Sequence, residues 1–466
     1  SFMEPASNAD LSDLGDVLRG IVQPFFVIPG NELRIQKIIF IHRVALNRTW
    51  FQSDVDGFAL RSYNHESRTA QYERTADGAL VTLQCYENWF PRGVEPLEAA
   101  RAFQSAKTAL EKECFESGML SSPTLTGLHA FESKLPFELP EGCPQPAWRT
   151  MLHLRTTQSR TDIWLPKTVS EFWYLDRRFA YAADAVLELP CGEPVLLEGE
   201  AAKPVPYETA WYEVIFEVPK GWQHVGLIPV LTGNLSGFEW AWPNEGRHGA
   251  FVAEPELRVA LAAGWKVEVL KKWLFEKARP LEKPVKLLIA LYERAKNCGQ
   301  SVEAGIYRDF VLRAIGGMYA RSYDRERIVS EAEILEIEDS SALTAQQIEG
   351  DRYAIKERTE KREGRFYQPE WTAYIWSRAR ARLNAALLSL PYESLIGCHV
   401  DAIYTDREPL TIADNGRVGQ FRLKGKLGCV VSFTTQPGAE FTLRTMADVQ
   451  KVKGFAEAVM RTEGGE

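Results

Sequence analysis

Two helical segments joined by a turn of only four residues narrow the possible folds of this chain more than any other pattern in it. Lys283 to Asn297 has an amphipathic helical pattern, and Val302 to Ser322 is a longer helical segment beyond the turn at residues 297–300. A connection this short forces consecutive helices to lie antiparallel. The sequence therefore predicts a helical hairpin in the second half of the chain.

Short apolar segments elsewhere in the chain are typical of strands. In the first 150 residues they occur together with a helical segment, Pro96 to Met119, so this region is expected to form an α/β or α+β domain. Beyond residue 150, strand patterns alternate with further helical segments. The expected strands are Phe25 to Ile28, Lys37 to Ile41, Leu80 to Tyr86, Trp173 to Ala183, Trp211 to Val218 and Trp265 to Leu270.

Length and charge exclude several classes of protein. A chain of 466 residues is too long for one ordinary domain, so two or three are expected. The formal net charge of −8 argues against wrapping of nucleic acid by a uniformly basic surface, but not against a local basic groove. No segment reaches the roughly 20 apolar residues that cross a bilayer. The seven cysteines are scattered without a Cys-x-x-Cys pair, which predicts reduced thiols, no zinc site and a cytoplasmic location.

Two carboxylate patterns at strand ends suit divalent metal ions. Asp176 follows an apolar strand pattern just before a turn, and Asp406 and Glu408 have the i, i+2 spacing that places side chains on one face of a strand. Magnesium binds through few carboxylates plus substrate phosphates. Two such ions about 4 Å apart clamp the attacking and leaving oxygens of phosphoryl transfer. Each pattern alone is more typical of a turn or cap residue, so the hypothesis depends on their order along the chain.

The order of segments between residues 152 and 454 resembles that of family B DNA polymerases, especially the small phage and protein-primed branch. The similar segments are Trp173 to Pro194 (first palm motif), Tyr307 to Tyr319 (fingers helix), Pro369 to Leu383 (helix entering the last catalytic strand) and His399 to Glu408 (catalytic hairpin). The resemblance implies an α+β, right-hand polymerase fold. Its expected parts are an antiparallel palm sheet, helical-hairpin fingers, a very short thumb and an N-terminal α/β exonuclease-like domain.

The resemblance also implies a domain layout. Residues 1–150 are expected to form the exonuclease-like domain, 151–280 and 326–440 the two parts of the palm, 281–325 the fingers and 441–466 a vestigial thumb. Five prolines between Pro123 and Pro146 are interpreted as a boundary or linker. Nuclease activity is not expected, because the early strands hold no carboxylate and Asp54-Val55-Asp56 is interpreted as a turn.

Roles of single residues follow from the same resemblance. Asp176 and Asp406 match the two metal-binding aspartates, and Glu408 stands where the family has a further Asp, so these three are the expected catalytic and metal-binding residues. Tyr181 matches the aromatic residue beneath the incoming sugar, and Tyr319 matches the fingers tyrosine at the nascent base pair. Further candidates for nucleotide binding are Arg294, Lys296, Arg308 and Arg313, and the candidates for DNA binding are Arg378, Arg382 and Lys424.

The expected activity is that of a DNA-directed DNA polymerase, which transfers a nucleotide from a dNTP to a primer 3′-hydroxyl. The resemblance implies two Mg²⁺ or Mn²⁺ ions as cofactors and no 3′–5′ proofreading. It implies primer–template DNA and dNTPs as partners, with a terminal protein or another replication factor as a further partner and no membrane. The expected location is the cytoplasm, that of a bacterial host for a phage- or plasmid-encoded protein.

Two alternatives remain open from the sequence. The first is a polymerase-like DNA-binding or replication-accessory protein with impaired catalysis, suggested by Glu408 and by Gly316-Gly317 in place of the family's Asn-Ser pair. The second is a metal-dependent nuclease that uses the same carboxylates. Incorporation of nucleotides, binding of DNA without incorporation, and release of mononucleotides distinguish the three.

Overall fold

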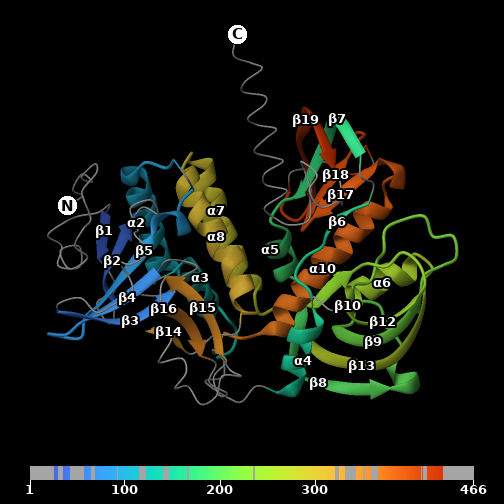
Figure 1. The fold of residues 1–466 in the computed structure, drawn as a ribbon, viewed down its shortest axis with the longest axis horizontal. Coiled ribbons are helices and arrows are strands. Elements are labelled where there is room, and N and C mark those ends of the chain that lie inside the picture. Colours follow the sequence, from blue (N-terminus) through green and yellow to red (C-terminus); the bar gives the residue numbers. More distant parts are fainter. Residues whose placement is uncertain are drawn as a thin grey trace, which may run out of the picture. The chain divides into compact units, whose positions relative to one another are not determined.

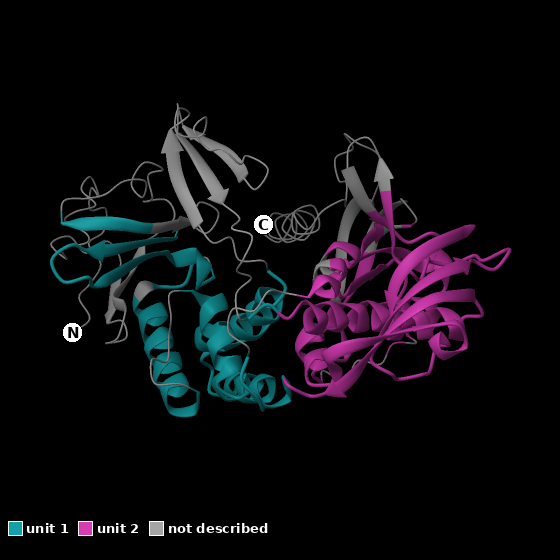
Figure 2. Cartoon of the chain, turned by 90° about the horizontal axis from the view of Figure 1, so that it is seen from below, with its two compact units in different colours: residues 1–145, 281–367 teal, residues 146–280, 368–466 magenta. Residues whose placement is uncertain are grey.

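The computed structural model has two compact units, each made of two separate stretches of chain. Unit 1 comprises residues 1–145 and 281–367, and unit 2 comprises residues 146–280 and 368–466 (Figure 2). The structure describes residues 26–29, 35–41, 57–64, 69–91, 93–114, 122–139, 146–164, 167–234, 237–320, 325–330, 343–349, 352–357, 366–410, 412 and 417–433. The stretch 441–466, expected as a thumb, and Asp54 and Asp56 lie outside these residues.

Unit 1 contains a five-stranded mixed sheet with the strand order β1-β2-β5-β4-β3 (Figure 1). Its strands are β1 (Phe26–Pro29), β2 (Ile35–Ile41), β3 (Phe58–Asn64), β4 (Thr69–Arg74) and β5 (Leu80–Cys85). The pair β2–β5 is parallel, and the other pairs are antiparallel. A second, antiparallel sheet of this unit joins β14 (Arg325–Ser330), β16 (Arg352–Glu357) and β15 (Leu343–Glu349).

The predicted helical hairpin is confirmed by α7 (Glu282–Asn297) and α8 (Ser301–Gly317). In unit 1, α8 packs against α7, α2 (Pro96–Glu113) and α3 (Pro123–Glu132). The contact with α3 is unusually close, because a Cβ atom at Gly127 would lie 2.4 Å from the carbonyl oxygen of Phe310. The hairpin therefore belongs to the same compact unit as the first 145 residues, which the sequence had not indicated.

The proline-rich stretch from Pro123 to Pro146 is not simply a linker. Pro123 opens α3, where its missing N–H costs no hydrogen bond, and Ser122 caps the helix by accepting the N–H of Leu125 at 3.1 Å. Pro146 lies directly before α4 (Ala147–Arg155). Two of the five prolines thus begin helices.

Unit 2 contains two antiparallel sheets, β19-β7-β18-β17-β6 and β12-β9-β13-β8, and the separate hairpin β10-β11. The strands of the first sheet are β6 (Thr161–Ile163), β7 (Lys167–Arg177), β17 (Leu395–His399), β18 (Ala402–Thr405) and β19 (Phe421–Phe433). Those of the second are β8 (Leu189–Glu198), β9 (Ala210–Glu217), β12 (Arg247–Ala253) and β13 (Lys266–Ala278). The hairpin strands are β10 (Val230–Asn234) and β11 (Gly237–Ala241), and the helices are α4, α5 (Ala180–Ala185), α6 (Glu254–Ala262) and α10 (Pro369–Leu388).

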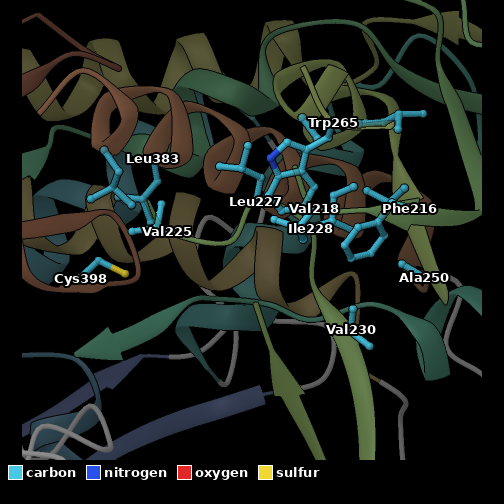
Figure 3. Packing of buried hydrophobic residues seen from close by; sticks show 14 of the residues in the cluster. Phe216, Val218, Val225, Leu227, Ile228, Val230, Ala250, Trp265, Leu383 and Cys398 are labelled. Atoms are coloured by element: carbon cyan, nitrogen blue, oxygen red, sulfur yellow. The ribbon is translucent and has the colours of Figure 1, made fainter. Parts of the chain in front are cut away.

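The main hydrophobic core of unit 2 joins α10 to both of its larger sheets. Leu383 and Leu387 of α10 pack in one cluster with Ile403 of the first sheet and Phe216 of the second. Figure 3 labels Leu383 and Phe216 within this cluster. Trp265, which precedes β13, closes the cluster beside Phe216, with ring centroids 5.4 Å apart. The buried helix therefore fixes the position of the first sheet, which carries the candidate site.

The strand predicted for Trp173 to Ala183 ends at Arg177, earlier than expected. Phe179 has a left-handed backbone with a φ of 51°, and the helix α5 begins at the next residue. The sequence Ala-Tyr-Ala-Ala-Asp-Ala consists largely of strong helix formers, which explains the change of conformation. Asp184 is fully buried on this helix.

Candidate functional site

Five residues form one row across the first sheet of unit 2. Strand pairing places Thr161 beside His399, His399 beside Ala402, Ala402 beside Asp176 and Asp176 beside Arg422. Directly paired residues of neighbouring strands present their side chains on the same face. The row therefore collects an imidazole, a carboxylate and a guanidinium on one face of the sheet.

The opposite face of the same strands is apolar. Leu175 pairs with Ile403 on one side and with Leu423 on the other, and all three pack in the core with α10. Because side chains alternate along a strand, Asp176 points away from this core. The side chain of Asp176 is 18% exposed and that of Arg422 is 36% exposed, so the polar face is accessible to solvent.

A second carboxylate, Asp401, adjoins this row at the turn between β17 and β18. The N–H of Arg177 donates to the carbonyl oxygen of Asp401 at 3.3 Å, which brings the turn to the end of β7. Val400, the other turn residue, has a left-handed φ of 57°, a conformation that costs energy for a β-branched residue. The strained turn thus places Asp401 next to the strand end that carries Asp176.

A stacked pair of tyrosines lies between the two carboxylates and the rest of the face. The rings of Tyr174 and Tyr404 are parallel, with centroids 5.3 Å apart. Burial, with smaller contributions from the charges of Asp176 and Asp401, raises the pKa of Tyr174 to about 12. Burial also raises the pKa of Tyr404, with smaller contributions from the same two carboxylates. Both carboxylates therefore lie close enough to these hydroxyls to act on them, and the tyrosines stay neutral at physiological pH.

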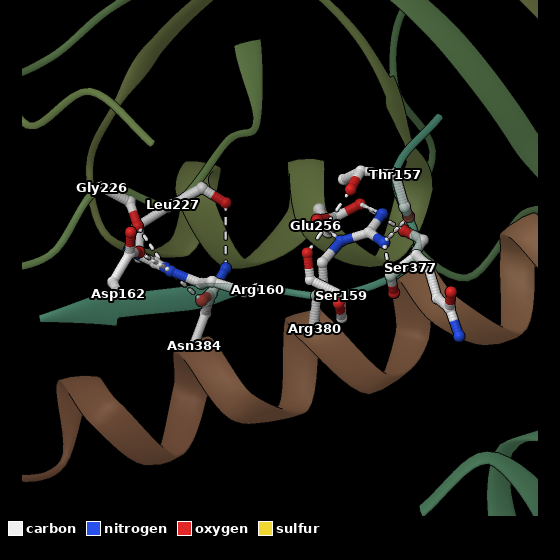
Figure 4. Close-up of polar contacts among 11 residues, drawn as sticks. Thr157, Ser159, Arg160, Asp162, Gly226, Leu227, Glu256, Ser377, Arg380 and Asn384 are labelled. Carbon is white, nitrogen blue, oxygen red and sulfur yellow. Dashed lines mark hydrogen bonds and ion pairs between the residues drawn. The ribbon is translucent and has the colours of Figure 1, made fainter. Parts of the chain in front are cut away.

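A buried arginine, Arg160, supports the turn that carries Asp401. Figure 4 shows the side-chain contacts of this arginine. Its carbonyl oxygen accepts the N–H of Val400 at 2.8 Å. Its guanidinium donates to Asp162 at 2.6 Å, to Asn384 of α10 at 2.7 Å and to the carbonyl of Gly226 at 2.7 Å. Arg160 therefore links the turn to α10, because its main-chain carbonyl binds Val400 and its guanidinium binds Asn384.

A second buried arginine, Arg380, ties α10 to α6 in the same view (Figure 4). It makes two hydrogen bonds with the carboxylate of Glu256, at 2.8 and 2.9 Å, and Ser377 donates to the same carboxylate at 2.6 Å. Its guanidinium also donates to the carbonyl of Thr157. Such a fully paired buried ion pair specifies how the helices pack.

The structure does not bring Asp406 to Asp176. Asp176 lies opposite Ala402, four residues before Asp406, and four residues of a strand span about 13 Å. Asp406 follows the far end of β18, where its N–H donates to the carbonyl of Ser394 at 3.0 Å. Glu408 lies two residues further along and is exposed. The expected group of Asp176, Asp406 and Glu408 therefore requires correction, with Asp401 as the neighbour of Asp176.

Tyr181 and Asp184 lie on the short helix α5, directly after β7. Burial is the main cause that raises the pKa of Tyr181, and the charge of Asp401 is the next contribution. Arg177 donates to both carboxylate oxygens of Asp184, at 2.6 and 3.0 Å, and to the carbonyl of Gly419 at 2.7 Å. This buried ion pair holds the end of β7 against the segment that leads into β19.

The expected nucleotide-binding cations lie on α7 and α8 of unit 1. Arg294 and Lys296 are exposed in the last turn of α7, and Arg308 and Arg313 are exposed on α8. Arg313 pairs with Asp309 at 3.4 Å, and Arg308 approaches the same carboxylate at 3.9 Å. Tyr319 lies two residues beyond the end of α8, which is shorter than predicted. These four cationic side chains are therefore accessible to an anion, and all of them belong to unit 1.

The expected DNA-binding residues differ in their surroundings. Arg378 is turned inward, donating to the carbonyls of Asp184 at 2.9 Å and Glu188 at 2.6 Å, and burial lowers its pKa. Arg382, one turn later on α10, is 43% exposed and lies 3.0 Å from the carboxylate of Asp184. Lys424 belongs to β19.

Three further features bear on cofactors and location. Among the described residues, no three or more His, Cys, Asp or Glu side chains form a cluster suited to a metal ion. Cys85, Cys114, Cys191, Cys298 and Cys398 form no disulfide bond. Over the same part of the chain, no helix is both long and apolar enough to cross a membrane.

Comparison with solved structures places this fold beside that of phi29 DNA polymerase. The orthorhombic crystal form of that enzyme matches with a TM-score of 0.57 and 14% sequence identity, over 84% of this chain and 76% of that chain. Its ternary complex with primer–template DNA and incoming nucleotide substrates matches with a TM-score of 0.57 and 13% sequence identity. Its binary complex with primer–template DNA matches with a TM-score of 0.54 and 13% sequence identity, and both matches cover the same shares of the two chains. The chain therefore has a mixed helix and antiparallel-sheet fold resembling that of phi29 DNA polymerase. No family model and no curated protein matches it.

Asp401 was missed by the sequence reasoning, although the sequence contains a signal for it. His399-Val400-Asp401 separates two apolar runs, Leu395 to Cys398 and Ala402 to Tyr404, as the turn of a hairpin does. Tyr404-Thr405-Asp406 resembles the expected motif more closely, so the assignment was made five residues further along the chain. The pairing of β18 with β7 brings Asp401, and not Asp406, next to the end of β7.

Proposed function

We propose that this chain is a template-directed DNA polymerase that transfers a nucleotide from a dNTP to the 3′-hydroxyl of a primer. The observation that supports this most strongly is the juxtaposition of Asp176 and Asp401 on a sheet of polymerase-like fold. The proposed partners are primer–template DNA and dNTPs, with a terminal protein or another replication factor as a further partner. Proofreading is not part of the proposal, since β1 and β2 carry no carboxylate.

The residues present suit hard divalent cations such as Mg²⁺ or Mn²⁺. Asp176 and Asp401 provide carboxylate oxygens from adjoining backbone positions, and magnesium typically takes one or two carboxylates together with substrate phosphates. Two bound ions would make the primer hydroxyl more acidic and neutralise charge that develops on the phosphates. We therefore assign metal binding to Asp176 and Asp401, in place of Asp406 and Glu408.

The surrounding residues of unit 2 would hold the two carboxylates in position rather than take part in the reaction. The buried pair of Arg177 and Asp184 fixes the strand end behind Asp176, and Arg160 fixes the turn behind Asp401. The Nδ1 atom of His399 forms a hydrogen bond with the hydroxyl of Thr161, at 2.9 Å. Burial lowers the pKa of His399, which favours the neutral imidazole. A neutral imidazole leaves the two carboxylates as the local anionic charge.

Other assigned roles follow the resemblance and remain part of the proposal. Tyr181 would lie beneath the sugar of the incoming nucleotide, and Tyr319 beside the nascent base pair. The triphosphate would meet cations of α7 and α8, namely Arg294, Lys296, Arg308 and Arg313. DNA would contact Lys424 and Arg382.

Primer extension tests the proposal. Wild-type protein is expected to extend a labelled primer–template in Mg²⁺ or Mn²⁺, and Asp176→Asn and Asp401→Asn should each lower the rate by on the order of 100-fold or more, as loss of a charge-stabilising group does in other active sites. Asp406→Asn is the matched control, since it removes the same charge at the far end of β18, and it should extend at nearly the wild-type rate. Circular dichroism verifies that the variants are folded.

Two outcomes contradict the proposal in different ways. Unchanged extension by both Asp176→Asn and Asp401→Asn would refute the assigned site. Loss of extension in Asp406→Asn but not in Asp401→Asn would restore the assignment made from the sequence.

A second function is favoured by one observation. The guanidinium of Arg422 lies 3.6 Å from the carboxylate of Asp176 and supplies a positive charge where a metal ion would bind. A DNA-binding protein of polymerase fold without nucleotidyl transfer is consistent with this pair. Tight binding of primer–template without incorporation in either Mg²⁺ or Mn²⁺ would favour this alternative.

A further inference from the structure

Unit 2 contains a pocket of about 460 Å³, and of the residues given a role in the proposed function only Arg382 lines it. Its walls come from α10, α6, the residues just before β8, the turn before β9 and the residue after β13. Four arginines line it, and they come from separate parts of the chain: Arg258, Arg279, Arg378 and Arg382. Only two carboxylates line it, Glu188 and Glu254. The lining is therefore positively charged although the whole chain is acidic.

Three of these arginines leave hydrogen-bond donors for a ligand. Arg258 uses its Nε atom to bind Glu254 at 2.8 Å, and Arg382 lies with its Nε atom 3.0 Å from Asp184. Arg279 lies 3.9 Å from Glu188, beyond hydrogen-bond distance. The contacts of Arg258 and Arg382 fix their guanidinium groups, and the remaining N–H groups of all three arginines have no acceptor among the described residues. Arg378 differs, because it donates to two carbonyls and forms part of the wall.

The rim of the pocket carries a strained and exposed aromatic residue. Tyr207 has a left-handed φ of 66° and is 71% exposed. Its N–H donates to Glu254 at 2.9 Å, and its ring lies 4.5 Å from the guanidinium of Arg258. A non-glycine residue kept in this conformation by buried partners is typical of ligand sites. The strain fixes the ring at the pocket entrance.

We propose that this pocket binds the phosphate group of a nucleotide, either free or within a DNA strand. Guanidinium groups bind phosphate oxygens through paired N–H donors, and three of them here converge from different segments. The volume suits one nucleotide, and the rim tyrosine gives a flat apolar surface for a base or sugar. The site lies apart from Asp176 and Asp401 in its lining residues, so it does not depend on the proposed catalysis.

Binding measured in EDTA tests the pocket without metal-dependent chemistry. The probes are dAMP, with deoxyadenosine as the ligand that lacks phosphate, and a fluorescein-labelled single-stranded oligothymidylate. Arg279→Gln and Arg382→Gln should each weaken phosphate-dependent binding by about tenfold, the usual effect of losing one charged hydrogen bond. Glu188→Gln should strengthen it, because this carboxylate lies beside Arg279 and Lys277.

Arg247→Gln is the matched control. Arg247 is a 64% exposed arginine of the same unit, paired with Glu268 at 3.1 Å, and it does not line the pocket. Its variant should bind both probes like the wild type. Thermal unfolding shows whether each variant is folded, and the exposed position of Arg279 keeps at least one pocket variant intact.

The two probes distinguish the source of the phosphate. Weakened binding of dAMP identifies a site for free nucleotides, and weakened binding of the oligonucleotide alone identifies a site for a strand phosphate. Equal affinities of wild type, Arg279→Gln and Arg382→Gln for both probes would overturn the proposal, as would an equal loss in Arg247→Gln. Because EDTA removes metal, a failure here leaves the extension assay to decide the polymerase proposal separately.

Discussion

Arg422 lies directly opposite Asp176 on neighbouring strands, with its Nη2 atom 3.6 Å from the carboxylate Oδ2. A positive charge at this distance stabilises the ionised carboxylate. It also competes with any cation that binds the same oxygens. The affinity of the proposed metal site would therefore be set partly by the arginine on the adjoining strand.

Replacing this arginine should tighten metal binding. In Arg422→Gln the competing charge is absent, and a partly exposed charge pair is worth on the order of 1 kcal/mol, or about fivefold in affinity. Electron paramagnetic resonance of free Mn²⁺ measures the dissociation constant directly. Arg407→Gln is the control, because Arg407 lies 3.8 Å from Asp406 and would matter only if Asp406 bound the metal. Tighter binding in Arg407→Gln alone would contradict this account.

The buried pair of Arg177 and Asp184 should be important for stability. Asp184→Asn would leave the guanidinium of Arg177 buried without its charged partner, which typically costs about 3–5 kcal/mol. Urea unfolding measures the loss. Asp309→Asn removes a partly exposed carboxylate paired with Arg313 at 3.4 Å, and should cost less than about 1 kcal/mol. Equal losses in the two variants would mean that burial does not decide the effect.

Two glycines of unit 1 should respond in opposite directions to alanine. In Gly127→Ala the new methyl group would collide with the carbonyl oxygen of Phe310, so we expect a loss of about 1–3 kcal/mol in the free energy of unfolding. In Gly305→Ala, within α8, the methyl group meets no atom within 4 Å, and better helix propensity should add about 0.5–1 kcal/mol. Thermal unfolding of the two variants checks both signs, and stabilisation by Gly127→Ala would disprove the close packing of α3 on α8.

His224 should make stability depend on pH. Its Nδ1 atom accepts the N–H of Val225 at 2.9 Å, and its Nε2 atom donates to the carbonyl of Leu390 at 3.1 Å, an arrangement that only the neutral ring satisfies. Burial lowers its pKa below the ordinary 6.5; the Leu390 hydrogen bond and Glu393 oppose this shift, and Arg160 adds to it.

Because the folded-state pKa is the lower one, the unfolded chain binds the proton first as pH falls. The contribution of His224 is therefore complete above about pH 6.5 and is lost as pH falls through the folded-state pKa. The free energy of unfolding, measured in urea from pH 7 to pH 5, should fall less steeply in His224→Gln than in the wild type. An unchanged slope would show that His224 does not titrate in this range.

Local patterns in the sequence predicted much of the fold. Apolar periodicity and the four-residue turn defined α7 and α8, with the start of α7 displaced by one residue and the end of α8 by five. The boundary between β7 and α5 was missed, because Phe179-Ala-Tyr-Ala is apolar enough to extend a strand pattern. What stops the strand is the left-handed backbone at Phe179, which single-residue propensity does not reveal.

The site was predicted less well because its geometry depends on strand pairing. Asp176 was identified from its position at a strand end. Its neighbour could not be chosen between Asp401 and Asp406 without the register of β18 on β7, which joins positions more than 220 residues apart. Arg422 was missed for the same reason, because the pairing of β19 with β7 is not indicated by any local sequence pattern.

The close contact of α3 with α8 also affects how the protein is made. Leu128 of α3 leaves the ribosome about 190 residues before α8, the helix that it packs against, is complete. At 5–20 residues per second this delay lasts roughly 10–40 s. During that time the apolar side of α3 lacks its partner α8, so slower translation lengthens the period in which the nascent chain can aggregate.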